Sequence, residues 1–261
     1  MDSGAVRSRA RSRHVSLGGA LALGTALGFY YAFHDRLWNA STWWDIAFLA
    51  FVLIPACFAL VWLLLPLRNA PGLLAAGLAF GVLALLFHLA GWNTPENFSK
   101  LFGVTAIGFW FLRYFETLNW VVLVALIIPW VDAYSVWRGP TKVIVNEHRN
   151  VFTNFSFAFA IPGEMSAANL GLPDLLFFAL FLAASVQWAL RPRVTWLLLT
   201  LSFGATLALA VWGRRDGLPA LPLLALAFLL ANGDLIWTRL RRERAERSGE
   251  TGTRSSGRNA P

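Results

Sequence analysis

The sequence contains few charged residues and a single cysteine. Only 14% of its 261 residues are Asp, Glu, Lys or Arg, roughly half the share found in soluble domains, which excludes an ordinary soluble globular protein. Cys57 has no second cysteine to pair with, which excludes an intrachain disulfide. No His, Cys and Glu cluster has metal-ligand spacing, so we expect no metal centre and no other cofactor.

Apolar and aromatic residues take the place of the missing charge. The chain is 57% hydrophobic and has 13 Trp and 21 Phe. Its net charge of +8 comes mostly from the two ends of the chain. Basic residues that flank apolar segments mark the cytoplasmic side of a membrane, so no nucleic-acid partner is expected. The basic residues are almost all arginine, a bias that suggests a GC-rich bacterial genome.

Eight apolar windows are candidates for membrane spans, which need about 20 mainly apolar residues. The windows cover residues 15–33, 44–65, 73–92, 101–115, 119–137, 173–190, 195–212 and 218–237. The sequence therefore predicts an all-α, polytopic transmembrane bundle of about eight spans, with the lipid bilayer as one of its partners.

An even number of spans places both termini on one side of the membrane. About twice as many Lys and Arg fall on that side as on the other, which favours cytoplasmic termini. We expect a multi-pass protein of the cell inner membrane. Residues 239–261 are basic and lack apolar periodicity, which predicts a disordered tail.

Two aspartates lie inside these apolar windows. A carboxylate at bilayer depth costs about 2.5–3.5 kcal/mol on insertion scales and usually has a function. Asp132 precedes Arg138, at the end of its span, by about 9 Å of helix, and Asp174 enters the next span at a comparable depth. Consecutive spans are antiparallel, so the two acids can face each other. Such a pair can share a proton and hydrolyse a peptide bond or relay protons or cations in a transporter; alternatively, one acid simply bonds to a backbone group.

The last window opens with a third unusual segment, Gly217-Leu-Pro-Ala-Leu-Pro222. Its two prolines interrupt the start of the helix and leave backbone groups free. Within a membrane, irregular backbone is tolerated where it is buried or lines a wet cavity. Taken alone, Pro-Ala-Leu is a common tripeptide at a plain helix start, so the segment indicates either such a start or backbone that is buried or lines a cavity.

The order of the three segments resembles the presenilin and signal peptide peptidase family of intramembrane aspartyl proteases. That family carries Tyr-Asp, Gly-x-Gly-Asp and Pro-Ala-Leu on its sixth, seventh and ninth spans. The resemblance covers residues 119–238 and implies that Asp132 and Asp174 are the catalytic pair. It further implies six residues that shape the site and contact substrate: Gly171, Leu172, Pro173, Pro219, Ala220 and Leu221. Residues 1–118 show only the apolar character of N-terminal transmembrane helices.

Two positions depart from the family pattern. Val131 replaces the tyrosine, although Tyr134 lies close by, and Pro173 replaces the glycine before the second aspartate. If Pro173 starts a helix, Asp174 lies in the first turn, where the helix dipole favours a negative charge.

These features support three functional hypotheses. The first is an aspartic endopeptidase that hydrolyses peptide bonds of transmembrane helices with the Asp132/Asp174 pair. The alternatives are a catalytically inactive relative that binds transmembrane segments and a small proton-coupled transporter. Outside the pair, we expect His88 to be a hydrogen-bonded packing residue and Asp234 to be neutralised by Arg239 or Arg241.

Overall fold

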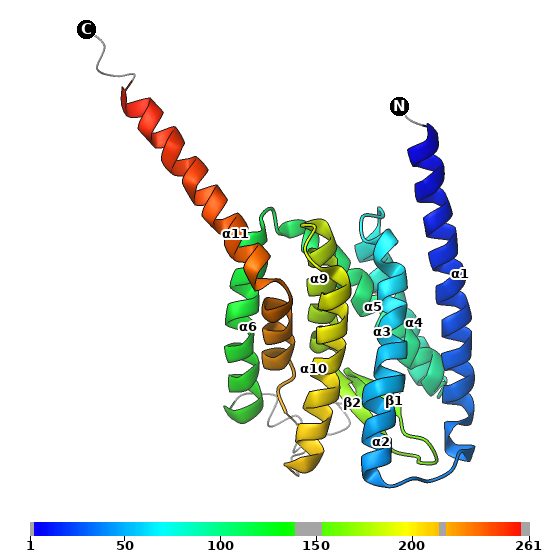
Figure 1. Cartoon of the computed structure of the whole chain (residues 1–261). Helices are drawn as coiled ribbons and strands as arrows, with labels where there is room; N and C mark the ends of the chain where they lie inside the picture. Colours follow the sequence, from blue (N-terminus) through cyan, green and yellow to red (C-terminus); the bar gives the residue numbers. More distant parts are fainter. Residues whose placement is uncertain (1–2, 139–152, 214–217, 257–261) are drawn as a thin grey trace.

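The fold is a bundle of helices with one small sheet (Figure 1). A computed structural model describes residues 3–138, 153–213 and 218–256, with side chains placed within 16–135, 153–213 and 218–242. The α-helices are α1 (Ser3–Phe33), α2 (Thr42–Phe48), α3 (Ile54–Leu64), α4 (Leu73–Leu89), α5 (Asn93–Phe111), α6 (Leu118–Arg138), α9 (Leu172–Gln187), α10 (Pro192–Trp212) and α11 (Leu221–Ser256). Short turns η1 (His34–Arg36), η3 (Leu65–Leu67) and η4 (Leu112–Tyr114) follow α1, α3 and α5, and a π-helical turn, η2 (Leu49–Leu53), joins α2 to α3.

Five helical segments are long and apolar enough to cross a membrane. They are Ser16–Arg36, Thr42–Leu67, Leu118–Ser135, Pro192–Trp212 and Leu221–Arg242. Two shorter apolar helices, α4 and α9, accompany them. These lengths and compositions are those of a helical membrane protein.

Each of the eight predicted windows contains a helix, but α5 differs from the prediction. It begins at Asn93 rather than at residue 101, and its first turns carry Glu96, Asn97 and Lys100. These polar residues keep α5 out of the set of helices apolar enough to span. The number of spans therefore stays a prediction.

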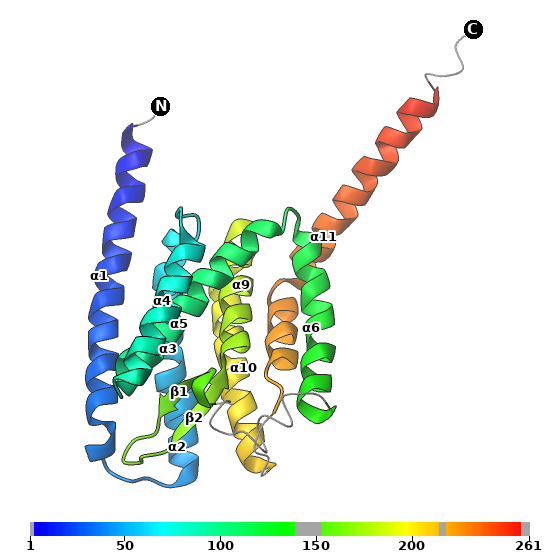
Figure 2. The same cartoon turned by 180° about the vertical axis from the view of Figure 1, so that it is seen from behind.

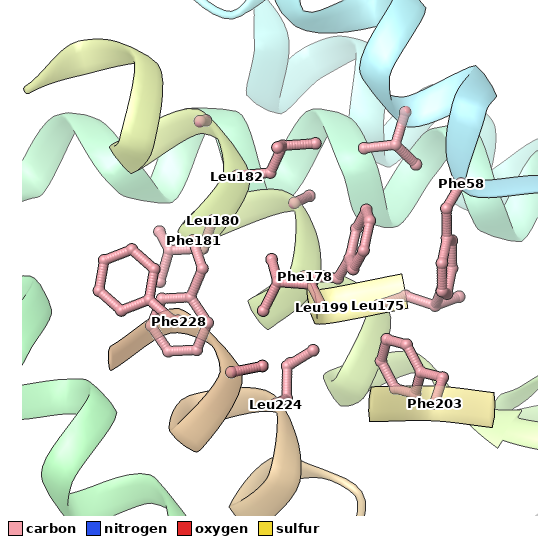
Figure 3. Packing of buried hydrophobic residues seen from close by; sticks show 14 of the residues in the cluster. Phe58, Leu175, Phe178, Leu180, Phe181, Leu182, Leu199, Phe203, Leu224 and Phe228 are labelled. Atoms are coloured by element: carbon pink, nitrogen blue, oxygen red, sulfur yellow. The ribbon is translucent and has the colours of Figure 1, made fainter. Parts of the chain in front are cut away.

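Helix α9 lies at the centre of the bundle (Figures 1 and 2). Its residues from Phe178 to Ser185 are completely buried. Figure 3 shows Phe178 and Phe181 within the core; Phe178 stacks on Phe58 with ring centroids 4.1 Å apart, and Phe181 stacks on Phe228 at 4.8 Å. Because α3 and α11 hold it in this way, α9 fixes the position of Asp174 in its first turn.

A glycine allows α5 to approach α9 closely. A Cβ atom at Gly108 would lie 2.9 Å from the Leu176 carbonyl oxygen and 3.1 Å from the Ala179 Cβ. Helices in membranes associate through such small residues. Gly108 therefore sets the distance between α9 and the neighbouring helix.

The all-α prediction omitted a two-stranded antiparallel sheet. Strand β1 (Ser156–Ala160) pairs with β2 (Ala167–Gly171), in register from Ser156 opposite Gly171 to Ala160 opposite Ala167. Both strands fall between the predicted windows 119–137 and 173–190. Phe155, Phe157 and Phe159 alternate with small residues, a period of two that is typical of a strand.

The tail also differs from the prediction. Helix α11 continues to Ser256, through residues expected to be disordered. The run from Leu240 to Arg247 contains only Leu, Arg, Glu and Ala, which are strong helix formers. The first residues of α1 and the last of α11 lie at the same end of the bundle (Figures 1 and 2), the arrangement that an even number of spans requires.

Candidate functional site

Asp132 contacts the segment that opens the last helix. It lies on α6, three residues after Pro129, and is half-buried. Its Oδ2 accepts a hydrogen bond of 3.1 Å from the backbone N–H of Leu221, the first residue of α11. Residues 89 positions apart in the sequence are joined by this bond. The Pro-Ala-Leu segment therefore reaches the first aspartate.

Helix α6 presents Asp132 and its neighbours on different faces. Val131 and Tyr134 are 54% and 66% exposed. Two residues along a helix correspond to about 200° of rotation, so Tyr134 lies on nearly the opposite face from Asp132. Tyr134 therefore does not supply the hydroxyl that Val131 lacks.

Asp174 occupies the third position of α9 and lies beside the residue that caps the helix. That N-cap residue is Gly171, with φ −58° and ψ 140°, and a Cβ added to it would lie 3.1 Å from Asp174 Oδ2. An acid in the first turn of a helix is favoured by the helix dipole. Pro173 needs no N–H partner at its position in the first turn, and its side chain is exposed.

The two acids lie on helices that contact each other, α6 and α9. In Figure 2 the start of α9, the start of α11 and the last part of α6 lie towards the same end of the bundle. Among the described residues no hydrogen bond joins the two carboxyl groups directly. The structure thus brings the predicted pair into one region without direct contact between them.

The remaining residues predicted for the site surround this pair. Leu172 donates its N–H to the Phe155 carbonyl at 3.1 Å, which ties the start of α9 to the strand. Pro219 is half-buried, and Ala220 and Leu221 are each 4% exposed. The Ala220 carbonyl accepts the N–H of Leu224, so it completes the first turn of α11.

Strand β2 leads directly into Asp174 and has one open edge. In an antiparallel pair, hydrogen-bonded and non-hydrogen-bonded pairs alternate. Because Leu172 donates to Phe155, this alternation directs the backbone groups of Asn169 and Gly171 away from β1. The sheet has two strands within the described residues, so the edge next to Asp174 remains available.

Strand β1 is held on its other edge by side chains that the sequence did not single out. Asn97 donates to the Ala158 carbonyl and accepts its N–H, both at 2.8 Å. Tyr31 and Tyr30 donate to the carbonyls of Ala158 and Ala160, each at 2.8 Å. No sequence pattern reports these contacts, because they join residues more than 60 positions apart.

Two further polar contacts were only partly predicted. His88 is hydrogen-bonded, at 3.2 Å to buried Glu96, which also binds Lys100 at 2.6 Å. The spacing of four residues between Glu96 and Lys100 is a signal for this ion pair. Asp234 pairs with Arg191 at 2.6 Å, so the prediction of Arg239 or Arg241 as its partner is wrong. Arg241 instead lies over the Trp237 ring, 4.9 Å from its centroid.

The site offers acids and backbone N–H groups. Burial of an acid disfavours its charged form, and a donated N–H favours it. Asp132 combines these opposing influences. Among the described residues there is no group of three or more His, Cys, Asp or Glu that could hold a metal ion.

No protein-family model matches the chain, and a search of curated proteins finds no match. The resemblance to the presenilin and signal peptide peptidase family therefore stays a prediction from three short segments.

Proposed function

We propose that the chain is an intramembrane aspartic endopeptidase that uses Asp132 and Asp174 as its catalytic pair. One observation carries the proposal: Asp132 accepts the Leu221 N–H, and its helix contacts α9, which has Asp174 in its first turn. The last part of α6 and the starts of α9 and α11 lie towards the same end of the bundle. Two acids in a largely apolar bundle, with no basic partner among the described side chains, need a function.

The reaction follows from the chemistry of paired carboxyl groups. The ionised acid takes a proton from a water molecule, whose oxygen attacks the peptide carbonyl carbon. The protonated acid donates its proton to the carbonyl oxygen. In the collapse of the tetrahedral intermediate the second acid takes back a hydroxyl proton, the C–N bond breaks, and the amine leaves with a proton from the first acid. A new carboxyl terminus forms and both acids return to their starting protonation. General acid–base catalysis of this kind typically raises the reaction rate 10²–10⁴-fold.

The substrate is a transmembrane helix that unwinds before cleavage. A helical peptide bond has its hydrogen bonds satisfied within the helix, so the reacting segment must be extended. The open edge of β2 offers backbone groups at Asn169 and Gly171 to such a segment. Pairing there places an extended chain beside Asp174.

The protein would sit in the inner membrane of a bacterium with both termini in the cytoplasm. The excess of Lys and Arg on the side of the termini supports this orientation. The site then lies in the outer half of the membrane, since α6 runs from the end of the bundle that carries the termini towards the opposite end.

An inactive relative that binds transmembrane segments is the second candidate. It is favoured by the places of the two acids, because Asp132 accepts an N–H at the start of α11 and Asp174 lies in the first turn of α9. Both acids would then stabilise helix starts, and β2 would hold a segment without cleaving it.

Cleavage in isotopically labelled water tests the proposal. The purified protein is incubated with a panel of transmembrane peptides in H₂¹⁸O, and the products are measured by mass spectrometry. We expect one ¹⁸O in each new carboxyl terminus, and loss of product in Asp132→Ala and Asp174→Ala. Asp35→Ala removes an exposed acid from the turn after α1 and serves as the control.

Two outcomes contradict the protease. Cleavage that persists in both site variants would show that another group acts. Peptide binding without cleavage by the wild type would support the inactive relative.

A further inference from the structure

A cavity of about 310 Å³ lies at the end of the bundle opposite the catalytic pair, where α10 begins. It is lined by Trp62 of the α3 helix and by Arg191, Pro192, Arg193 and Val194 at the start of α10. The tryptophan and the proline and valine side chains make its surface apolar, while two arginines stand at its rim. It shares no residue with the proposed catalytic site.

One of the arginines is held in a fixed position. Arg191 binds both carboxylate oxygens of Asp234, with Nη1–Oδ1 at 2.8 Å and Nη2–Oδ2 at 2.6 Å. Its backbone N–H donates to the Oδ1 of Asn232, a completely buried residue of α11. Fixed donors lose little conformational freedom when they bind a ligand. The contacts with α11 therefore pre-organise Arg191 for ligand binding on this side of the cavity.

The second arginine leaves the cavity with an unbalanced charge. Arg193 is exposed, and in the part of the chain that the structure describes it has no acidic partner. Asp234 offsets the charge of Arg191 alone. The rim therefore carries a net positive charge beside an apolar surface.

The cavity lies where a membrane meets water. Pro192 is the first residue of one candidate span, and the span that contains Trp62 ends at Leu67. Tryptophan is enriched at this depth. Basic pockets between spans at the cytoplasmic surface bind the headgroups of anionic lipids.

We propose that this cavity binds an anionic phospholipid. The phosphodiester contacts Arg193 and the exposed side of Arg191, and the glycerol and first methylene groups lie on Trp62, Pro192 and Val194. A zwitterionic lipid brings a cation that the rim repels, and free phosphate does not use the apolar surface. Both parts of the cavity fit one occupant, a lipid with a net negative headgroup.

Native mass spectrometry of the full chain in detergent tests the site. The probes are phosphatidylglycerol, phosphatidylcholine with the same acyl chains, and glycerophosphate. Arg193→Gln removes the unbalanced charge, and Val194→Trp fills the cavity at constant charge. Arg36→Gln changes an arginine at the other end of the bundle, which lies over the Phe33 ring at 5.4 Å, and is the control.

We expect the wild type and Arg36→Gln to bind phosphatidylglycerol at least about tenfold more tightly than phosphatidylcholine, the scale of one charge-assisted hydrogen bond. Each cavity variant should weaken phosphatidylglycerol binding about tenfold. Equal binding of the two lipids, unchanged binding in both cavity variants, or displacement of the lipid by glycerophosphate at equal concentration would overturn the proposal. Lipid binding is read without any cleavage, so these results are independent of the proposed protease activity.

Discussion

Each aspartate of the proposed pair lies beside a residue at the start of a helix. Leu221 donates its N–H to Asp132 from another helix, and Gly171, the N-cap residue of α9, lies next to Asp174 within one turn. The sequence predicted the two acids, because the free-energy cost of a carboxylate in a membrane follows from the residue type. It predicted that they can face each other, because consecutive spans are antiparallel. It did not predict that Leu221 donates to Asp132, since backbone contacts depend on how α6 and α11 pack.

Gly171 is the residue whose side chain would disturb the pair most directly. A Cβ there would lie 3.1 Å from Asp174 Oδ2, so Gly171→Ala should move the carboxylate and lower cleavage about tenfold. Its backbone, at φ −58° and ψ 140°, suits alanine. We therefore expect the free energy of unfolding to stay the same or rise by up to about 1 kcal/mol.

Steady-state cleavage and thermal unfolding of the same preparation check this prediction. Gly28→Ala is the matched control, because a Cβ at Gly28 meets nothing within 4 Å. Equal cleavage rates in the two variants would mean that the position of Asp174 does not matter for activity.

Among the secondary-structure elements, the two-stranded sheet was not predicted from the sequence. The hydrophobic windows predicted where helices lie because each needs only local apolar content. Strands β1 and β2 are short, and their stability comes from α5 and α1 through Asn97 and Tyr31. Local sequence carries little information on such contacts. The partner of Asp234 was not predicted for the same reason, because Arg191 lies 43 positions away at the start of another helix.

Asn97→Leu should destabilise the fold by about 1–3 kcal/mol, because it leaves the N–H of Ala158 without its partner. Tyr31→Phe should cost less, about 1 kcal/mol, since Asn97 still donates to the Ala158 carbonyl. Thermal unfolding of the two variants in one detergent gives the comparison. A larger loss in Tyr31→Phe than in Asn97→Leu would contradict this account of β1.

For the whole molecule, the sequence predicted a membrane bundle with both termini at one end, and the helices are arranged in that way. It predicted the span limits less well, since α5 starts with polar residues that pair inside the protein. Which end faces the cytoplasm follows only from the distribution of Lys and Arg.

Cysteine labelling in intact cells tests that orientation. Cys57 is completely buried and the chain has no other cysteine, so the background should be low. We expect an impermeant maleimide to label Asp35→Cys in intact cells. It should label Asn69→Cys, an exposed position in the turn after α3, only after permeabilisation. The reverse pattern would invert the proposed topology.

The most direct test of the central claim is whether the two acids act as one unit. The measurement compares cleavage of one transmembrane peptide by the wild type, Asp132→Asn, Asp174→Asn and the double variant, each checked for an unchanged unfolding temperature. We predict that each single change lowers the rate by about 10²–10⁴-fold and that the double change lowers it no further. Losses that multiply in the double variant, or a single variant with the wild-type rate, would contradict a catalytic pair.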